Sequence, residues 1–227
     1  MFWVYSFGLW LVRNLEDKPK RIVKNGIILL KNNGIDEVIS EKYFYKTDAY
    51  YTILKFEHDG KNIVPKSDEV LDAYIVPICL TKAKHAGIPT CDWEVSYSYV
   101  PLPSIIYGLN YFSDPSNYFI VNDQDYAKKI INQVTHNGKY LFCYQKIAED
   151  SVLITCNSIF GRTSHLDKKI KSLSKKIFET FKIPLVSIVF VKNEENYCLS
   201  SLCPTKYSGL REEKEILQEY IKEGGYE

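Results

Sequence analysis

One stretch, Ser174 to Leu210, most constrains the fold of this chain, because it alternates helix, strand, hairpin and terminal loop without a break. A helix enters this stretch from upstream and is ended by Pro184. Its apolar residues recur on one face at helical spacing: Leu166, Ile170, Leu173, Ile177, Phe178 and Phe181. Leu185 to Val191 has the apolar, β-branched composition of a strand buried on both faces, and Tyr197 to Leu202 returns after a charged turn. The stretch predicts an α/β fold with a mixed sheet, in which Leu185 to Val191 is a buried central strand.

A last helix is predicted beyond Cys203, Pro204 and Gly209. Its apolar residues again repeat at helical spacing: Leu210, Ile216, Leu217, Tyr220 and Ile221. We expect Gly224 and Gly225 to end this helix.

The N-terminal third predicts a strand, a helix and further strands. Met1 to Val12 is apolar, too short to span a bilayer and without the marks of a signal peptide, so we interpret it as a core strand of a cytoplasmic protein. Lys18 to Asn33 is predicted to be a helix that ends at Asn33-Gly34. Composition predicts strands at Ile35 to Tyr45, Tyr50 to Glu57 and Asp72 to Leu80.

The stretch Cys91 to Pro115 combines prolines and a glycine, which are typical of loops, with many aromatic residues. An internal aromatic cluster is the ordinary interpretation of such a stretch. The alternative is a ligand-pocket wall, for which the candidate residues are Trp93, Tyr107 and Tyr111.

Beyond this loop, Tyr118 to Val121 is predicted to be a strand, followed by a helix that Asn122 or Asp123 caps. Lys139 to Ile147 and Ser151 to Ile159 are then predicted to form a hairpin.

The 227 residues carry a net charge of +1, so the overall charge of the chain does not favour binding to nucleic acid or to an acidic membrane.

The six cysteines contain no Cys-x-x-Cys pair, and buried thiols are the preferred interpretation. A single methionine beside abundant lysine and glutamate is seen in heat-adapted proteins. In such a source a disulfide between Cys198 and Cys203 becomes a candidate.

The C-terminal stretch resembles the RimK-type carboxylate-amine ligases of the ATP-grasp family. In that family the last strand carries Glu-Val-Asn before a small residue, a proline and a glycine. The corresponding run here is Leu199-Ser200-Ser201-Leu202-Cys203-Pro204. The resemblance places Ser200 where the family has its magnesium-binding glutamate and Leu202 where it has its asparagine. Magnesium requires hard oxygen ligands, so neither residue suits it.

The resemblance extends upstream. His58-Asp59-Gly60-Lys61 and Asp72-Ala73-Tyr74-Ile75-Val76-Pro77 are similar to the end of the family's small N-terminal domain. Tyr144, Gln145, Lys146 and Ile147 look like the segment whose backbone meets adenine, so they are our candidate nucleotide-binding residues. The family's phosphate-binding lysine has no counterpart in Ser104 to Gly108, and the glycine-rich flap is missing. We therefore expect residues 1–90 to form an N-terminal α/β domain and residues 91–227 a reduced ATP-grasp-like domain.

Two classes of function follow. The first is a ligase scaffold without catalytic or metal-binding residues, which binds an adenine nucleotide such as ATP, or a protein partner. The second is a nucleic-acid-binding module that uses the lysine-rich helix from Asp167 to Lys182. Its candidate residues share one polar face: Lys168, Lys171, Lys175 and Lys182. A solvated helix face is the ordinary interpretation of that pattern. A hydrolase or metal enzyme has little support, because the four histidines show no short ligand spacing.

Overall fold

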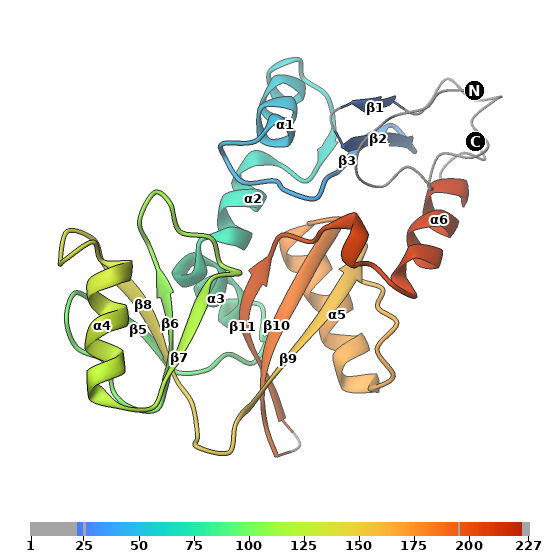
Figure 1. The fold of residues 1–227 in the computed structure, drawn as a ribbon. Coiled ribbons are helices and arrows are strands. Elements are labelled where there is room, and N and C mark those ends of the chain that lie inside the picture. The colour runs from blue at the N-terminus through green and yellow to red at the C-terminus, as the bar shows by residue number, and fades with distance from the viewer. Residues whose placement is uncertain (1–21, 25, 195, 224–227) are drawn as a thin grey trace. The chain divides into compact units, whose positions relative to one another are not determined.

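The computed structural model describes residues 22–24, 26–194 and 196–223 (Figure 1). The predicted strand at Met1 to Val12 and the predicted stop at Gly224 and Gly225 lie outside these residues. The helices are α1 (Asp48–His58), α2 (Ser67–Tyr74), α3 (Val76–His85), α4 (Gln124–Val134), α5 (Lys168–Phe181) and α6 (Glu213–Glu223). The strands are β1 (Ile22–Lys24), β2 (Ile27–Asn32), β3 (Ile35–Ile39), β4 (Ile63–Val64), β5 (Trp93–Ser96), β6 (Ser104–Gly108), β7 (Tyr118–Val121), β8 (Phe142–Lys146), β9 (Val152–Ile159), β10 (Leu185–Asn193) and β11 (Asn196–Cys203). The predicted α/β class with mixed sheets and flanking helices is confirmed.

The chain divides into two compact units, and each is described by itself. One contains the described residues of Met1–Val70, Asn157–Val186 and Pro204–Glu227; the other contains Leu71–Cys156 and Ser187–Cys203. The domain boundary expected at residue 90 stays a prediction. No helix in the described part of the chain is long and apolar enough to cross a membrane.

The first unit is built on the sheet β1-β2-β3-β4, in which β4 runs parallel to β3 and the other pairs are antiparallel. Apolar residues of β2, β3 and α6 form one core with Leu185 and Tyr207. The Tyr207 hydroxyl lies 3.2 Å from two backbone oxygens, those of Gly26 and Ile39. The segment after β11 is therefore fixed to the N-terminal sheet by apolar contact and by a buried hydroxyl.

Three predictions for the N-terminal third are wrong. Lys18 to Asn33 was expected to be a helix, but its described part forms β1 and β2, joined at Gly26, whose φ of +74° glycine adopts readily. Tyr50 to Glu57 was expected to be a strand, but it lies in α1, which Thr47 caps by accepting a hydrogen bond from Tyr50 N. Asp72 to Leu80 was likewise expected to be a strand, but it forms the end of α2 and the first half of α3.

The second unit is built on the antiparallel sheet β5-β8-β6-β7 (Figure 1). Helix α4 covers one face through a core that includes Ile106, Ile130 and Phe142. Residues of α3, β10 and β11 pack with the other face, where Leu80, Tyr107 and Val191 share a second core. Because β6 and β8 pack on both faces, their residues are buried at nearly every position.

Two expectations for this unit are corrected. Cys91 to Pro115 is not loop throughout, because it contains β5 and β6. The hairpin of Lys139 to Ile147 with Ser151 to Ile159 is absent, because β8 pairs with β5 and β6, whereas β9 belongs to the sheet β11-β10-β9. The predicted strand Tyr118 to Val121 is confirmed as β7, and Asp123 caps α4 by accepting from Tyr126 N at 2.8 Å.

The C-terminal elements follow the sequence prediction closely. Strand β10 is the central strand of its sheet, pairs with β11 as a hairpin, and leaves Ile188 0% exposed. Asp167 caps α5, and Lys182, at a φ of +56°, ends it. Leu166 is the exception among the apolar residues assigned to this helix, because it precedes the cap and is 90% exposed.

Candidate functional site

A buried network of hydroxyl groups lies in the second unit. The Tyr107 hydroxyl oxygen lies 2.7 Å from Ser200 Oγ and donates to Ser201 Oγ at 3.2 Å. Because tyrosine has one hydroxyl proton, the Ser200 hydroxyl is then the donor to Tyr107. Ser201 Oγ in turn lies 3.4 Å from Cys203 Sγ. Ser200 and Ser201 are both 0% exposed, so the network is sealed from water.

Gln145 connects this network to strand β8. Its side chain is completely buried, and its Nε2 donates to the Ser200 carbonyl oxygen at 2.8 Å. Its Oε1 has no hydrogen-bond partner among the described residues. β8 is therefore tied to β11 by a buried amide that holds the backbone of Ser200 in place.

A β-bulge explains how two consecutive serines reach one tyrosine. Val189 pairs with Ser201, but Phe190 pairs with Leu199, so Ser200 is the extra residue on β11. Consecutive side chains on a regular strand point to opposite faces, and a bulge re-aims them. The bulge thus lets the hydroxyls of Ser200 and Ser201 both meet Tyr107.

The chemistry of this network does not suit magnesium. Burial raises the pKa of Tyr107 above its ordinary value and raises the pKa of Cys203 to about 12. Both groups are therefore neutral near pH 7, and the serine hydroxyls are neutral too. Magnesium is held mainly by carboxylate and phosphate oxygens. Within the described residues, no group of three histidine, cysteine or acidic side chains is placed to hold a metal.

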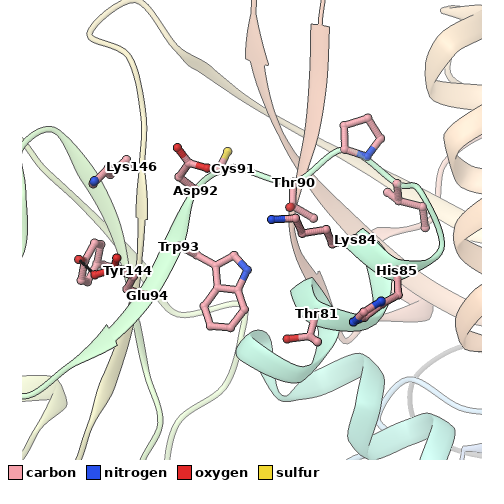
Figure 2. Close-up of a pocket in the computed structure, with 12 residues that line it drawn as sticks. Thr81, Lys84, His85, Thr90, Cys91, Asp92, Trp93, Glu94, Tyr144 and Lys146 are labelled. Carbon is pink, nitrogen blue, oxygen red and sulfur yellow. Dashed lines mark hydrogen bonds between the residues drawn. The ribbon is translucent and has the colours of Figure 1, made fainter.

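The same unit also contains a pocket of about 920 Å³ (Figure 2). It is lined from the end of α3, the segment that follows α3, and strands β5 and β8. In Figure 2 the Trp93 indole lies between Tyr144 on one side and Lys84 and His85 on the other. The Tyr144 hydroxyl donates to Glu94 Oε2 at 2.5 Å. Burial, and then this hydrogen bond, raise the pKa of Tyr144 to about 12, so Tyr144 presents a neutral phenol.

The charges around the pocket balance. Lys84 and Lys146 contribute two positive charges, and Asp92 and Glu94 contribute two negative ones. The lining therefore has no net field that would favour a highly charged ligand over a less charged one. Trp93 provides a large aromatic face, which suits a planar ring.

The backbone N–H groups at the end of β8 are already used. Lys146 N donates to Asp92 O at 2.8 Å, and Ile147 N donates to Pro103 O at 3.2 Å. A ligand at this segment would meet the exposed side chain of Lys146 instead of free backbone donors.

The structure separates the candidate nucleotide-binding and pocket residues into three groups. Trp93, Tyr144 and Lys146 line the pocket. Gln145 and Tyr107 belong to the buried network, and Ile147 packs against the apolar core near them. Tyr111 is exposed and meets the Phe112 ring edge to face, with the ring centroids 5.3 Å apart. As binding residues, all of these stay predictions.

The candidate nucleic-acid-binding lysines lie on or just after α5, whose opposite face is buried through Ile170 and Ile177. Lys168 and Lys171 are exposed. Lys175 Nζ lies 4.0 Å from Glu179 Oε1, so an acidic residue lies within the basic face.

Sequence reasoning missed several pocket residues. Asp92, Glu94, Lys84 and His85 were not among the candidate binding residues. All four lie near Trp93 in the sequence, but the fold decides which of them line the pocket. The pairing of β5 with β8 places Glu94 opposite Tyr144, whereas Lys84 and His85 reach the pocket from the end of α3.

Comparison with solved structures identifies the class of fold as ATP-grasp. The chain matches a RimK-domain ATP-grasp protein from Sphaerobacter thermophilus with a TM-score of 0.56 and 12% identity, over 77% of this chain and 73% of that one. It matches the D-alanine–D-alanine ligase of Helicobacter pylori with a TM-score of 0.58 and 12% identity, over 90% and 76%. The Bacillus anthracis D-alanine–D-alanine ligase, crystallised with ATP, matches with a TM-score of 0.52 and 12% identity, over 68% of this chain and 61% of that ligase.

Comparison with protein-family models also gives a match. The model of the RimK-like ATPgrasp N-terminal domain matches residues 112–219. The resemblance to the RimK-type ATP-grasp family, predicted from sequence, is therefore confirmed. No curated protein matches the sequence.

Proposed function

We propose that this chain is a non-catalytic relative of the RimK-type ATP-grasp ligases that binds an adenine nucleotide in the pocket around Trp93. The observation that carries the proposal is the sealed network of Tyr107, Ser200 and Ser201. The two serines lie on β11, where the resemblance places the metal-binding glutamate of the family. Tyr107 lies on β6, which corresponds to the strand in which the family has its phosphate-binding lysine. Neutral, mutually satisfied hydroxyls cannot stabilise the charge that develops in phosphoryl transfer.

Magnesium-dependent ligation is accordingly expected to be absent. The test is ATP turnover with magnesium across a panel of amino acids and acidic acceptors, with an active ATP-grasp ligase as the positive control. We expect no turnover above the protein-free reaction. A rate on the order of 1 per second, as ordinary enzymes show, would contradict the non-catalytic part of the proposal.

Nucleotide binding is expected to be weak and insensitive to the number of phosphates. The aromatic face of Trp93, which is partly exposed, can hold a planar base, whereas the balanced charges of the pocket add little for phosphates. Titration calorimetry should give dissociation constants on the order of 1 mM for AMP, ADP and ATP. The three values should agree within about threefold, which corresponds to less than about 1 kcal/mol.

Two matched variants test the location. Trp93→Leu should abolish measurable binding, and Tyr97→Leu should leave it unchanged, because Tyr97 is exposed and does not line the pocket. If ATP binds far more tightly than AMP, the protein has a phosphate site outside the charge-balanced pocket. If none of the three nucleotides binds at millimolar concentration, the nucleotide part of the proposal is wrong.

The nucleic-acid-binding alternative stays a prediction. The exposed Lys168 and Lys171 permit it, but Glu179 beside Lys175 reduces the positive field of the helix. The pocket and the buried network therefore favour the nucleotide proposal.

A further inference from the structure

Two cysteines meet at the edge of the pocket in the second unit. Cys91 lines the pocket in the segment after α3, and Cys198 lies on β11. These two segments are joined by a parallel bridge between Thr90 and Leu199, and Leu199 N donates to Pro89 O at 2.7 Å. Cys91 and Cys198 share one apolar cluster, and their thiols are hydrogen-bonded to each other.

The two thiols differ from the other buried cysteines. Burial raises the pKa of Cys143 to about 12 and raises the pKa of Cys79 above its ordinary value, so both stay protonated near neutral pH. The hydrogen bond that the Cys91 thiol donates lowers the pKa of Cys198 to about 7. Cys198 is only half-buried, whereas Cys91 is buried. Cys198 is therefore a half-buried thiol that ionises more readily than the other cysteines and has a second thiol beside it, which is the arrangement of an attacking and a resolving cysteine.

We propose that Cys91 and Cys198 form a reversible disulfide that ties the pocket-lining segment Pro89 to Asp92 to strand β11. The inference rests on the contacts within this unit and goes beyond the nucleotide proposal, because it holds whether or not a nucleotide binds. The oxidant is a low-molecular-weight disulfide of the glutathione class.

The reaction balances as two thiol–disulfide exchanges. The Cys198 thiolate attacks one sulfur of the oxidant, forms a mixed disulfide and releases one thiolate. The Cys91 thiol gives up its proton to solvent, and its sulfur attacks the Cys198 sulfur and releases the second thiolate. Both released thiolates take up protons, so two cysteine thiols lose two electrons in total and the oxidant becomes two thiols.

The structure also excludes the other cysteine pairing, which the sequence offered only as a candidate beside free buried thiols. Cys198 and Cys203 lie on the same strand, five residues apart. At about 3.3 Å per residue their Cα atoms are about 16 Å apart, whereas a disulfide requires less than about 7 Å. The candidate Cys198–Cys203 disulfide is therefore wrong for the folded chain.

Peptide mapping after oxidation distinguishes the pairings. The full chain is incubated with oxidised glutathione, its remaining thiols are blocked, and trypsin is added without reduction. Cys91 lies in the tryptic peptide 85–128, and Cys198 and Cys203 both lie in 193–206. We expect the two peptides to be joined, with a mass two hydrogens below their sum, in most molecules and to separate on reduction. The linked pair should persist in Cys203→Ser and disappear in Cys198→Ser.

A second measurement remains informative if a variant folds poorly. In the native wild-type protein, alkylation of Cys198 by iodoacetamide should reach half its maximal rate near pH 7, and Cys91→Ala should move this midpoint upward. Cys79→Ala is the matched control and should leave the midpoint unchanged. The proposal is overturned if oxidation leaves only a glutathione adduct on Cys198, closes a disulfide within peptide 193–206, or leaves both peptides reduced. Because nucleotides are absent from both measurements, their failure would not bear on the nucleotide proposal.

Discussion

Replacing Ile188 with alanine should lower the free energy of unfolding by about 2 to 5 kcal/mol. Ile188 is 0% exposed on the central strand β10 and pairs with Leu202 on β11. Removing its side chain loses the transfer free energy of the deleted carbons and leaves a cavity that a sheet packed on both faces cannot easily close. Urea unfolding followed by circular dichroism measures the change.

Val152→Ala is the matched control for this prediction. Val152 is also a β-branched strand residue, but it is 57% exposed on β9. Its replacement should change the free energy of unfolding by no more than about 0.5 kcal/mol. Equal effects of the two substitutions would mean that β10 is not the buried centre of its sheet.

Local signals explain why the C-terminal elements could be predicted. Asp167 and Asp123 are strong N-cap residues placed directly before amphipathic runs, and both caps are present. The run Leu185 to Val191 has no helical periodicity, so strand was the natural prediction, and β10 contains all of it. These features depend on neighbours within a few residues, which one sequence displays.

Local composition led to a wrong prediction for Tyr50 to Glu57, which was expected to be a strand. Its tyrosines and isoleucine have high β-propensity, which is weak information beside tertiary context. The spacing that mattered was Ala49 to Ile53, four residues apart and both buried in α1. The Thr47 cap before them was the overlooked local signal.

The candidate site could be predicted only in part. Ser200 was singled out by the resemblance, but its contact with Tyr107 joins residues 93 positions apart in the chain. That contact also depends on the bulge in β11, and nothing in the run Leu199 to Cys203 shows where an extra residue falls. Sequence therefore singled out the position of Ser200, whereas the structure was needed to find the residues that contact it.

Restoring the family's acidic residue should destabilise this protein instead of creating a magnesium site. Ser200→Glu would place a carboxylate at a position that is 0% exposed, beside the Tyr107 hydroxyl and the Gln145 amide. An uncompensated buried charge costs about 3 to 5 kcal/mol, and the larger side chain must also displace Tyr107. The free energy of unfolding of Ser200→Glu should fall by at least about 3 kcal/mol. The addition of 10 mM magnesium, roughly the upper end of ordinary assay conditions, should not restore it, because the other ligands of a complete octahedral site are missing.

Two companion variants separate charge from the loss of the network. Ser98→Glu, at an exposed position of the same unit, should change stability by no more than about 0.5 kcal/mol. Tyr107→Phe keeps the ring but leaves the hydroxyls of Ser200 and Ser201 without this partner, so it should cost about 1 to 3 kcal/mol. If Ser200→Glu is as stable as the wild type, or if magnesium raises its midpoint of unfolding, then the position is open to solvent and cations. The sealed network could then no longer support the proposed absence of ligase activity, and the non-catalytic proposal would lose the observation that carries it.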